Sequence, residues 1–580
     1  MAKQERQPGR VIGVNGNMIT VEFGERVIQN EVAFVCVDEN TRLKSEVVRV
    51  RGHVADLQVY EETSDTVVAN PVEFTGEQLS VVLGPGLLGR VFDGLQNPLP
   101  ELAERGGFFL ERGVYLDPLD KESTWEFTPT AKVGDELESA ETVGTVPEGM
   151  FDHQIMIPFR WQGKWKLTEV AEKGTYKLCD VMAKAVQGGE EREITMMQTW
   201  PVRQALEAYE EKVLPEETLV TQQRIIDTFF PVAKGGTFCT PGPFGAGKTV
   251  LQHAMARYSQ VDVVVVAACG ERAGEVVEIL REYPELEDPR TGQSLMDRTI
   301  IICNTSSMPV AAREASVYTS VTLAEYYRQM GLNVLMLADS TSRWAQALRE
   351  RSGRLEEIPG EEAFPAYLES LIAGFYERAG LTRLRDGRLG SVTIGGAVSP
   401  AGGNFEEPVT QATLKVVGCF LGLSRDRANA RRYPSIHPLD SWSGYNPLVD
   451  SILVRKARDI LARGNEVNQM MKVVGEEGTP ISDFVTYLKS EYIDATYLQQ
   501  NTFDEVDGAT SAERQTYVFG KISDILDTTF DFDTKDDARA FFSQLRQVTV
   551  DWNYAAWDSD EFKQLEQQID RLIAKNTEAE

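Results

Sequence analysis

The pattern of hydrophobic and polar positions changes several times along the chain. Near the N-terminus, apolar residues alternate with polar ones, as at Ile19, Val21 and Phe23, which follow an Asn-Gly pair. Alternation with a period of two is typical of strands that bury one face, and Asn-Gly favours a hairpin turn. Because a closed barrel removes exposed strand edges, we expect a β-barrel over residues 1–75 and a linker over 76–114.

Residues 115–200 remain rich in β-branched residues, glycine turns and tryptophan, which predicts a second β-rich module. A lipoyl-type carrier would have a similar composition, but it would present a lysine at a tight turn. No lysine is suitably placed here. The pattern therefore favours a structural insertion.

After residue 200, short apolar runs alternate with longer segments of helical period. Such alternation implies a mostly parallel sheet with helices on both faces. We expect strands at 237–240, 261–268, 299–303, 334–338 and 391–398, and helices at 248–259, 274–282 and 313–330. From 446 to 580, apolar residues such as Ile460, Leu461 and Val467 follow a 3.6-residue spacing, which predicts a helical C-terminal domain.

The net charge of the chain disfavours two classes of function, nucleic-acid binding and docking on an anionic membrane surface. Lys and Arg total 59 against 89 Asp and Glu, so the net charge is −30. A nucleic-acid binder needs a basic face, and so does a protein that docks on an anionic membrane surface. The first residues lack the apolar core of a secretory signal, and the apolar runs are too short to cross a bilayer. We expect a cytoplasmic protein with reduced, scattered cysteines and no His/Cys metal site.

The strongest chemical motif is Gly-Pro-Phe-Gly-Ala-Gly-Lys-Thr at 242–249, which matches GxxxxGK(S/T). It lies between an expected strand and an expected helix, where glycines let backbone N–H groups turn toward one phosphate. Lys248 would reach the β- and γ-phosphates, and the Thr249 hydroxyl would bind Mg²⁺. We expect an ATP or ADP site formed by Gly242, Pro243, Phe244, Gly245, Ala246, Gly247, Lys248, Thr249 and Val250.

Two carboxylates follow expected strands of the same sheet. Asp339 ends an apolar strand, where a P-loop protein holds Mg²⁺, usually through water, although a helix-capping aspartate would look the same. Glu271 follows the strand that begins near residue 261, and it would polarise an attacking water. Arg272 would steady charge on the transferred phosphoryl group, and a surface ion pair is the alternative for Glu271 and Arg272.

At these motifs the chain resembles the catalytic A subunit of vacuolar/archaeal-type rotary ATPases, a relative of the F-type β subunit. The resemblance covers nearly the whole chain and includes Ala-Asp-Ser-Thr-Ser-Arg-Trp at 338–344. Further matching segments are 241–250, 270–272, 304–316, 352–357, 364–368, 375–379, 398–405 and 497–501. It implies a multidomain α/β fold in which 1–75 is the barrel, 115–200 the A-subunit-specific insertion, 201–445 a RecA-like domain and 446–580 the helical domain.

The resemblance also implies roles for single residues. Lys248, Glu271 and Arg272 would be catalytic, and Tyr433 and Phe503 would enclose the adenine by stacking. The family usually has Phe at the position of Tyr433, and the segment 435–440 departs from the common Ser-Ile-Asn-Trp pattern. Ala246 stands where eukaryotic relatives have cysteine, so redox control through that thiol is not expected.

The implied assembly is a ring in which three such chains alternate with three non-catalytic B subunits, each supplying an arginine to an ATP site. Central and peripheral stalk subunits would connect the ring to a separate membrane sector that moves H⁺ or Na⁺. Neither the ion nor the direction, pump or synthase, follows from this chain.

The sequence leaves three alternative functions, some of related ATPases and some of another functional class. An F-type β subunit or a secretion-type hexameric ATPase would lack the β-rich insertion. A Rho-like RNA translocase would need a basic groove, which a net charge of −30 disfavours. A regulatory subunit that binds nucleotide without hydrolysis is disfavoured by the presence of both Lys248 and Glu271.

Overall fold

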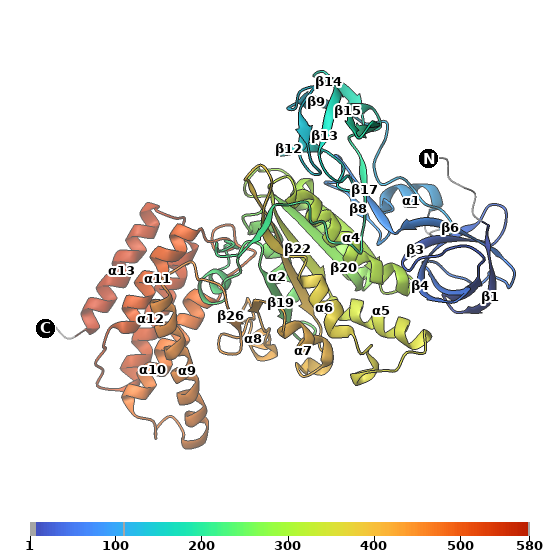
Figure 1. Ribbon diagram of the computed structural model, residues 1–580. Helices are drawn as coiled ribbons and strands as arrows, with labels where there is room; N and C mark the ends of the chain where they lie inside the picture. The colour runs from blue at the N-terminus through green and yellow to red at the C-terminus, as the bar shows by residue number, and fades with distance from the viewer. Residues whose placement is uncertain (1–6, 108–110, 578–580) are drawn as a thin grey trace. The chain divides into compact units, whose positions relative to one another are not determined.

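The computed structural model describes residues 7–107 and 111–577 and divides into two compact units (Figure 1). The first unit comprises Met1–Leu214, Val261–Gly396 and Gln411–Thr413. The second comprises Pro215–Gln260, Ala397–Thr410 and Leu414–Glu580. The domain boundaries expected near residues 75, 114, 200 and 445 stay predictions.

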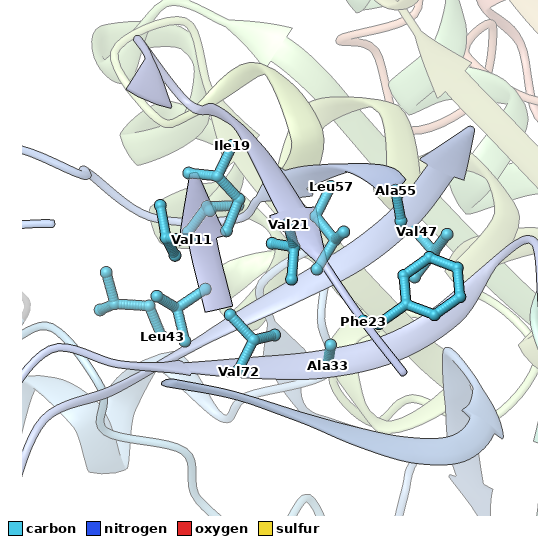
Figure 2. Close-up of a cluster of buried hydrophobic side chains, with 12 residues drawn as sticks. Val11, Ile19, Val21, Phe23, Ala33, Leu43, Val47, Ala55, Leu57 and Val72 are labelled. Atoms are coloured by element: carbon cyan, nitrogen blue, oxygen red, sulfur yellow. The ribbon is translucent and has the colours of Figure 1, made fainter. Parts of the chain in front are cut away.

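The N-terminal part of the first unit is a closed six-stranded barrel, as the alternating pattern predicted. A cluster of its apolar side chains, among them Val21, Leu43 and Leu57, is buried and points into the barrel interior (Figure 2). Burial of one such side chain contributes about 1.5–3 kcal/mol. The strand order is β1-β2-β5-β4-β3-β6, with β1 at Gly9–Asn15, β2 at Met18–Glu22, β3 at Glu31–Cys36, β4 at Arg42–Arg51, β5 at Val54–Val59 and β6 at Pro71–Gln78.

The expected β-rich insertion consists of two four-stranded sheets, in the orders β10-β13-β15-β16 and β12-β11-β9-β14. Strand β17 (Gln198–Pro201), where the chain leaves the insertion, pairs antiparallel with β7 (Ser80–Leu83). The other strands are β9 (Thr124–Pro129), β10 (Glu136–Leu137), β11 (Thr142–Glu148), β12 (Phe151–Met156), β13 (Trp165–Val170), β14 (Gly174–Lys177), β15 (Val181–Gln187) and β16 (Glu190–Thr195).

A mainly parallel sheet forms the rest of the first unit. Its strands lie in the order β24-β22-β20-β21-β8, and β20 is buried along its whole length. Strands β18 (Glu211–Val213) and β23 (Gly380–Arg383) pair antiparallel beside β24. The remaining elements are β8 (Val91–Phe92), α1 (Leu99–Gly106), β20 (Val263–Glu271), α3 (Ala273–Glu285), β21 (Thr299–Thr305), α4 (Val310–Arg328), β22 (Asn333–Asp339), α5 (Thr341–Arg354), α6 (Leu368–Tyr376) and β24 (Leu389–Val398).

Several boundaries differ from the sequence-based expectation, and two of the differences have a clear physical reason. Strand β20 runs on to Glu271 because Gly270, at φ 80°, forms a bulge that keeps the pairing with β21. Helix α4 begins at Val310 rather than at 313, directly after Pro309. A proline is well suited to a helix start because its missing N–H would have no partner there.

The second unit contains the P-loop and the C-terminal helices. Strand β19 (Thr237–Pro241) pairs parallel with β25 (Cys419–Phe420), and β25 pairs antiparallel with β26 (Trp442–Ser443). Helix α2 (Lys248–Tyr258) follows β19, and α8 (Arg425–Asn429) follows β25. The C-terminal bundle, drawn in orange and red in Figure 1, contains α9 (Ser451–Val474), α10 (Ile481–Ile493), α11 (Ala512–Asp527), α12 (Lys535–Tyr554) and α13 (Asp560–Asn576).

Side-chain caps explain where several of these helices begin. Asp450, Ser511, Thr534 and Ser559 each accept a hydrogen bond from a backbone N–H in the first turn of the helix that follows. A cap of this kind contributes about 1 kcal/mol. Within the described residues, no helix is both long and apolar enough to span a membrane.

Candidate functional site

The glycine-rich loop between β19 and α2 has the backbone shape of a phosphate cradle. Gly245 and Gly247 have φ of 79° and 85°, values that side chains disfavour. A Cβ atom at Gly242 would lie 2.7 Å from Cβ of Leu423, so only glycine fits there. No side chain caps α2, and no acidic residue lies in its first turn. The helix N-terminus is therefore suited to an anion.

Lys248 is held against this loop. Its ammonium Nζ donates to the carbonyl oxygen of Gly242 at 2.8 Å and to that of Pro243 at 3.3 Å. Thr249 follows in the first turn of α2. A lysine placed over a loop and a hydroxyl at the helix start suit a nucleotide phosphate and its Mg²⁺. The predicted phosphate-binding residues are thus together on one loop.

Tyr433 lies beside the same loop. Its ring carbon Cε1 would be 3.4 Å from a Cβ atom built at Gly247, and the residue is 43% exposed. Two residues later, the Ser435 hydroxyl donates to the carbonyl oxygen of Ala246 at 2.5 Å. The segment that departs from the family pattern is therefore tied directly to the P-loop.

Phe503 belongs to a neighbouring loop of the same unit. The Gln500 N–H donates to the Tyr433 carbonyl oxygen at 2.9 Å, which joins the segment before Phe503 to the tyrosine. The Phe503 ring is 85% exposed. The exposed ring is accessible for the stacking on adenine that the family resemblance implies, and this role stays a prediction.

The predicted catalytic carboxylate Glu271 and the predicted Mg²⁺ residue Asp339 lie at the carboxyl-terminal ends of neighbouring strands in the first unit. Glu271 is the last residue of β20, and Asp339 is the last residue of the adjacent β22. Ala268 of β20 pairs with Asp339, and both carboxylate residues are less than 10% exposed. Ligands of open α/β sheets bind at the carboxyl ends of such strands.

Two arginines that the sequence analysis did not identify surround the bulge before Glu271. A Cβ atom at Gly270 would lie 3.1 Å from Cδ of Arg313 and 3.1 Å from Cβ of Arg343. Each stands in the first turn of a helix that follows a strand of this sheet. A cation is unfavourable at a helix N-terminus, so this position was a usable signal of function.

Glu275 was also missed, although it lies one helical turn after Glu271. A hydrogen bond to Glu271 is the main cause that raises the pKa of Glu275, to about 7; partial burial and the charge of Glu271 raise it further. Arg272 and Arg343 act in the opposite direction. Arg272 itself precedes α3, with an exposed side chain. The Glu275 carboxyl therefore lies within hydrogen-bonding reach of the Glu271 carboxylate.

The site residues are divided between the two compact units. The P-loop, Tyr433 and Phe503 belong to the second unit, whereas Glu271, Arg272 and Asp339 belong to the first. Within the described residues, there is no group of three or more His, Cys, Asp or Glu that would hold a metal ion. A Mg²⁺ ion held mainly by phosphate and water needs no such group.

Comparison with known families agrees with this architecture in four segments. Residues 11–76 match the β-barrel domain of the ATP synthase alpha/beta family, and residues 116–203 match its barrel-sandwich domain. Residues 222–443 match the nucleotide-binding domain of the same family. Residues 451–528 match the C-terminal domain of V and A type ATP synthase.

Several relatives also match this chain over nearly its whole length. The V-type ATP synthase alpha chain of Treponema denticola is 63% identical over 98% of this chain and 97% of its own length. The V-type ATP synthase alpha chain 1 of Treponema pallidum is 61% identical over 97% and 95%. The corresponding chain of Borrelia garinii subsp. bavariensis is 59% identical over 97% and 98%. The resemblance inferred from the motifs is confirmed, and the chain belongs to the V-type ATP synthase alpha chain family.

Proposed function

We propose that the chain is the catalytic subunit of a V/A-type rotary ATPase and that it hydrolyses or synthesises ATP. The observation that carries this proposal is the glycine-rich loop that holds Lys248 and leads into α2, a helix without a side-chain cap. It occurs in a chain 63% identical to a V-type ATP synthase alpha chain. The match of residues 451–528 to the V and A type C-terminal domain favours this class over an F-type β subunit.

Each site residue then has a role that its surroundings support. Lys248 and the loop N–H groups bind the phosphates of ATP or ADP, and the Thr249 hydroxyl binds Mg²⁺. Asp339 holds the same ion through water. Mg²⁺ would neutralise charge on the phosphates during transfer.

The chemistry of hydrolysis is assigned to the carboxyl edge of the sheet. Glu271 orients and polarises the attacking water, and Arg272 stabilises the negative charge of the transferred group. Tyr433 and Phe503 stack on the adenine. The low exposure of Glu271 keeps its carboxylate away from bulk water.

The proposal includes an assembly. Non-catalytic B-type subunits alternate with this chain in a ring and supply an arginine to each site. Stalk subunits link the ring to a membrane sector that moves H⁺ or Na⁺, so this chain lies on the cytoplasmic side without entering the bilayer. The acidic surface, with a net charge of −30, suits basic faces on such partners.

The test is ATP turnover and ATP-driven ion uptake by the assembled complex with Lys248→Ala. Removal of a charged hydrogen-bond donor to phosphate is expected to weaken nucleotide binding about 10- to 100-fold and to abolish ion uptake at ordinary ATP concentrations. Lys456→Ala is the matched control, because Lys456 pairs with Asp527 on the exterior of the helical bundle. Unchanged turnover in Lys248→Ala would contradict the proposed function.

Glu275→Gln is expected to remove a step from the pH profile of ATP hydrolysis. In the wild type, Glu275 is protonated below its pKa of about 7 and donates to Glu271, in competition with the attacking water. Turnover should therefore rise as the pH passes through 7. The glutamine amide donates at every pH, so the variant should stay at the low-pH rate between pH 6 and 8.

The control for this experiment is Glu278→Gln, which removes an exposed carboxylate from the same helix. It should keep the wild-type profile. A Glu275→Gln profile that retains the step near pH 7 would show that another group is responsible.

A further inference from the structure

A cavity in the first unit is not used by the proposed chemistry. It has a volume of about 700 Å³, within the usual range of 300–1,000 Å³ for ligand sites. Its lining includes the barrel loop 60–64, the turn after β8 at 93–97, the segment 111–114, and the loop that leads from β21 into α4 at 304–310. Strands β8 and β21 are parallel neighbours, so the cavity lies at their carboxyl ends.

The floor of the cavity contains an unsatisfied amide. Asn304 is only 1% exposed, yet both its side-chain oxygen and its side-chain nitrogen lack a hydrogen-bond partner among the described residues. A buried polar group without a partner costs about 1–3 kcal/mol, and a ligand that reached this amide and supplied both an acceptor and a donor would recover that cost. A peptide group has this combination.

The N-terminus of α4 adds further donors to the cavity wall. Helix α4 is 19 residues long, and Pro309 at its N-cap position provides no side-chain cap. Its first turn contains no acidic residue, and Val310 and Ala312 line the cavity. The N–H groups of a helix start are directed at acceptors, which the carbonyl oxygens of a peptide would provide.

The two arginines that line the cavity, Arg112 and Arg354, already form hydrogen bonds or ion pairs with other residues of the chain. Arg112 donates to the Glu62 carbonyl oxygen at 3.2 Å and to the Ser64 hydroxyl at 3.3 Å, and it pairs with Asp65. Arg354 is bonded to the Asn17 side chain. Their charges are therefore less available to a ligand than the carboxylates of the rim.

The remaining charge of the cavity is acidic. Burial raises the pKa of Glu61 and of Asp93, and both carboxyls accept hydrogen bonds from backbone, amide and tyrosine groups. Buried Lys44 faces both carboxyls, and burial lowers its own pKa. Glu62 is exposed at the rim. A cation that enters the cavity would relieve this excess of carboxyl groups.

We propose that this cavity binds a segment of a partner chain that carries arginine or lysine. Asn304 and the start of α4 engage the peptide groups of the segment, and Glu62 with Glu61 receives its cationic side chain. A phosphate or an acidic peptide is disfavoured, because four carboxyl groups line the cavity against two engaged arginines.

The test uses the full chain without nucleotide, titrated with acetyl-Gly-Arg-Gly-amide and followed by calorimetry or ligand-observed NMR. We expect saturable binding, weakened at least 10-fold by Asn304→Ala and by Glu62→Arg. Glu126→Ala, an exposed acidic position on β9 away from the cavity, should bind as the wild type does.

Two further compounds, an acidic peptide and a polyamine, test which chemical feature of the ligand the cavity recognises. Acetyl-Gly-Glu-Gly-amide should not bind, and spermidine should bind more weakly than the arginine peptide because it lacks the peptide group. The proposal is overturned by absent peptide binding, by equal binding of either compound, or by an unchanged affinity in Asn304→Ala. Since no ATP is present, none of these results bears on the proposed ATP turnover.

Discussion

Glu271→Gln is expected to slow ATP hydrolysis by the assembled enzyme about 10²- to 10⁴-fold, the range that general-base catalysis usually contributes. Nucleotide affinity should change little, because the phosphates are assigned to the P-loop. Glutamine keeps the size of the side chain and loses only the charge that polarises the water. Single-turnover hydrolysis and nucleotide binding, measured side by side, separate the two effects.

The geometry around Glu271 explains why the loss should be large. The Gly270 bulge is enclosed by Arg313 and Arg343, and the Glu271 carbonyl oxygen accepts the Ser306 N–H at 2.9 Å. The carboxylate is therefore carried by a fixed backbone. Glu271→Asp keeps the charge, but its side chain is one methylene shorter, so the carboxylate lies farther from the attacking water. A displacement of about 1 Å can itself lower the rate about 10²-fold.

Glu285→Gln is the matched control, since Glu285 is an exposed residue at the end of α3. Its turnover should equal that of the wild type. If Glu271→Gln hydrolyses ATP at the wild-type rate, another residue polarises the water, and the nearby Glu275 would be the next candidate to test.

Much of this site was predictable because its signals are local. The P-loop needs only glycines, Lys248 and the helix that follows, and all of these are adjacent in the sequence. The barrel was predictable because its buried residues alternate with a period of two. The hydrophobic runs also located the strands that end at Glu271 and Asp339.

The missed residues depend on contacts between distant segments. Arg313 and Arg343 reach the bulge at Gly270 only because α4 and α5 follow β21 and β22, the two strands that flank β20. The raised pKa of Glu275 depends on the direction in which Glu271 points after that bulge. The Asn304 amide likewise lacks a hydrogen-bond partner because of how distant segments pack, and the hydrophobic pattern of the sequence does not predict this.

Arg224→Ala is expected to destabilise the second unit by about 3–5 kcal/mol, because it leaves a buried carboxylate without its cation. The Arg224 side chain is 2% exposed and pairs with Asp507 at 2.5 Å. It also donates to the carbonyl oxygens of Tyr497 at 3.0 Å and Gln499 at 2.5 Å. One side chain thus joins the segment before β19 to the segment that precedes α11.

Hydrogen exchange of peptides from 497–527 is the measurement for Arg224→Ala, because it reports on this unit separately from the first. Exchange there should accelerate, while exchange in the barrel strands β1–β6 stays unchanged. Arg463→Ala is the control: Arg463 forms ion pairs at 59% exposure, and such surface pairs contribute about 0–1 kcal/mol. Equal protection in Arg224→Ala and Arg463→Ala would mean that the Asn501 N–H, which donates to the Asp507 carboxylate at 2.7 Å, suffices without the arginine. In that case the loop that carries Phe503 is held by α11 and its neighbours rather than by Arg224.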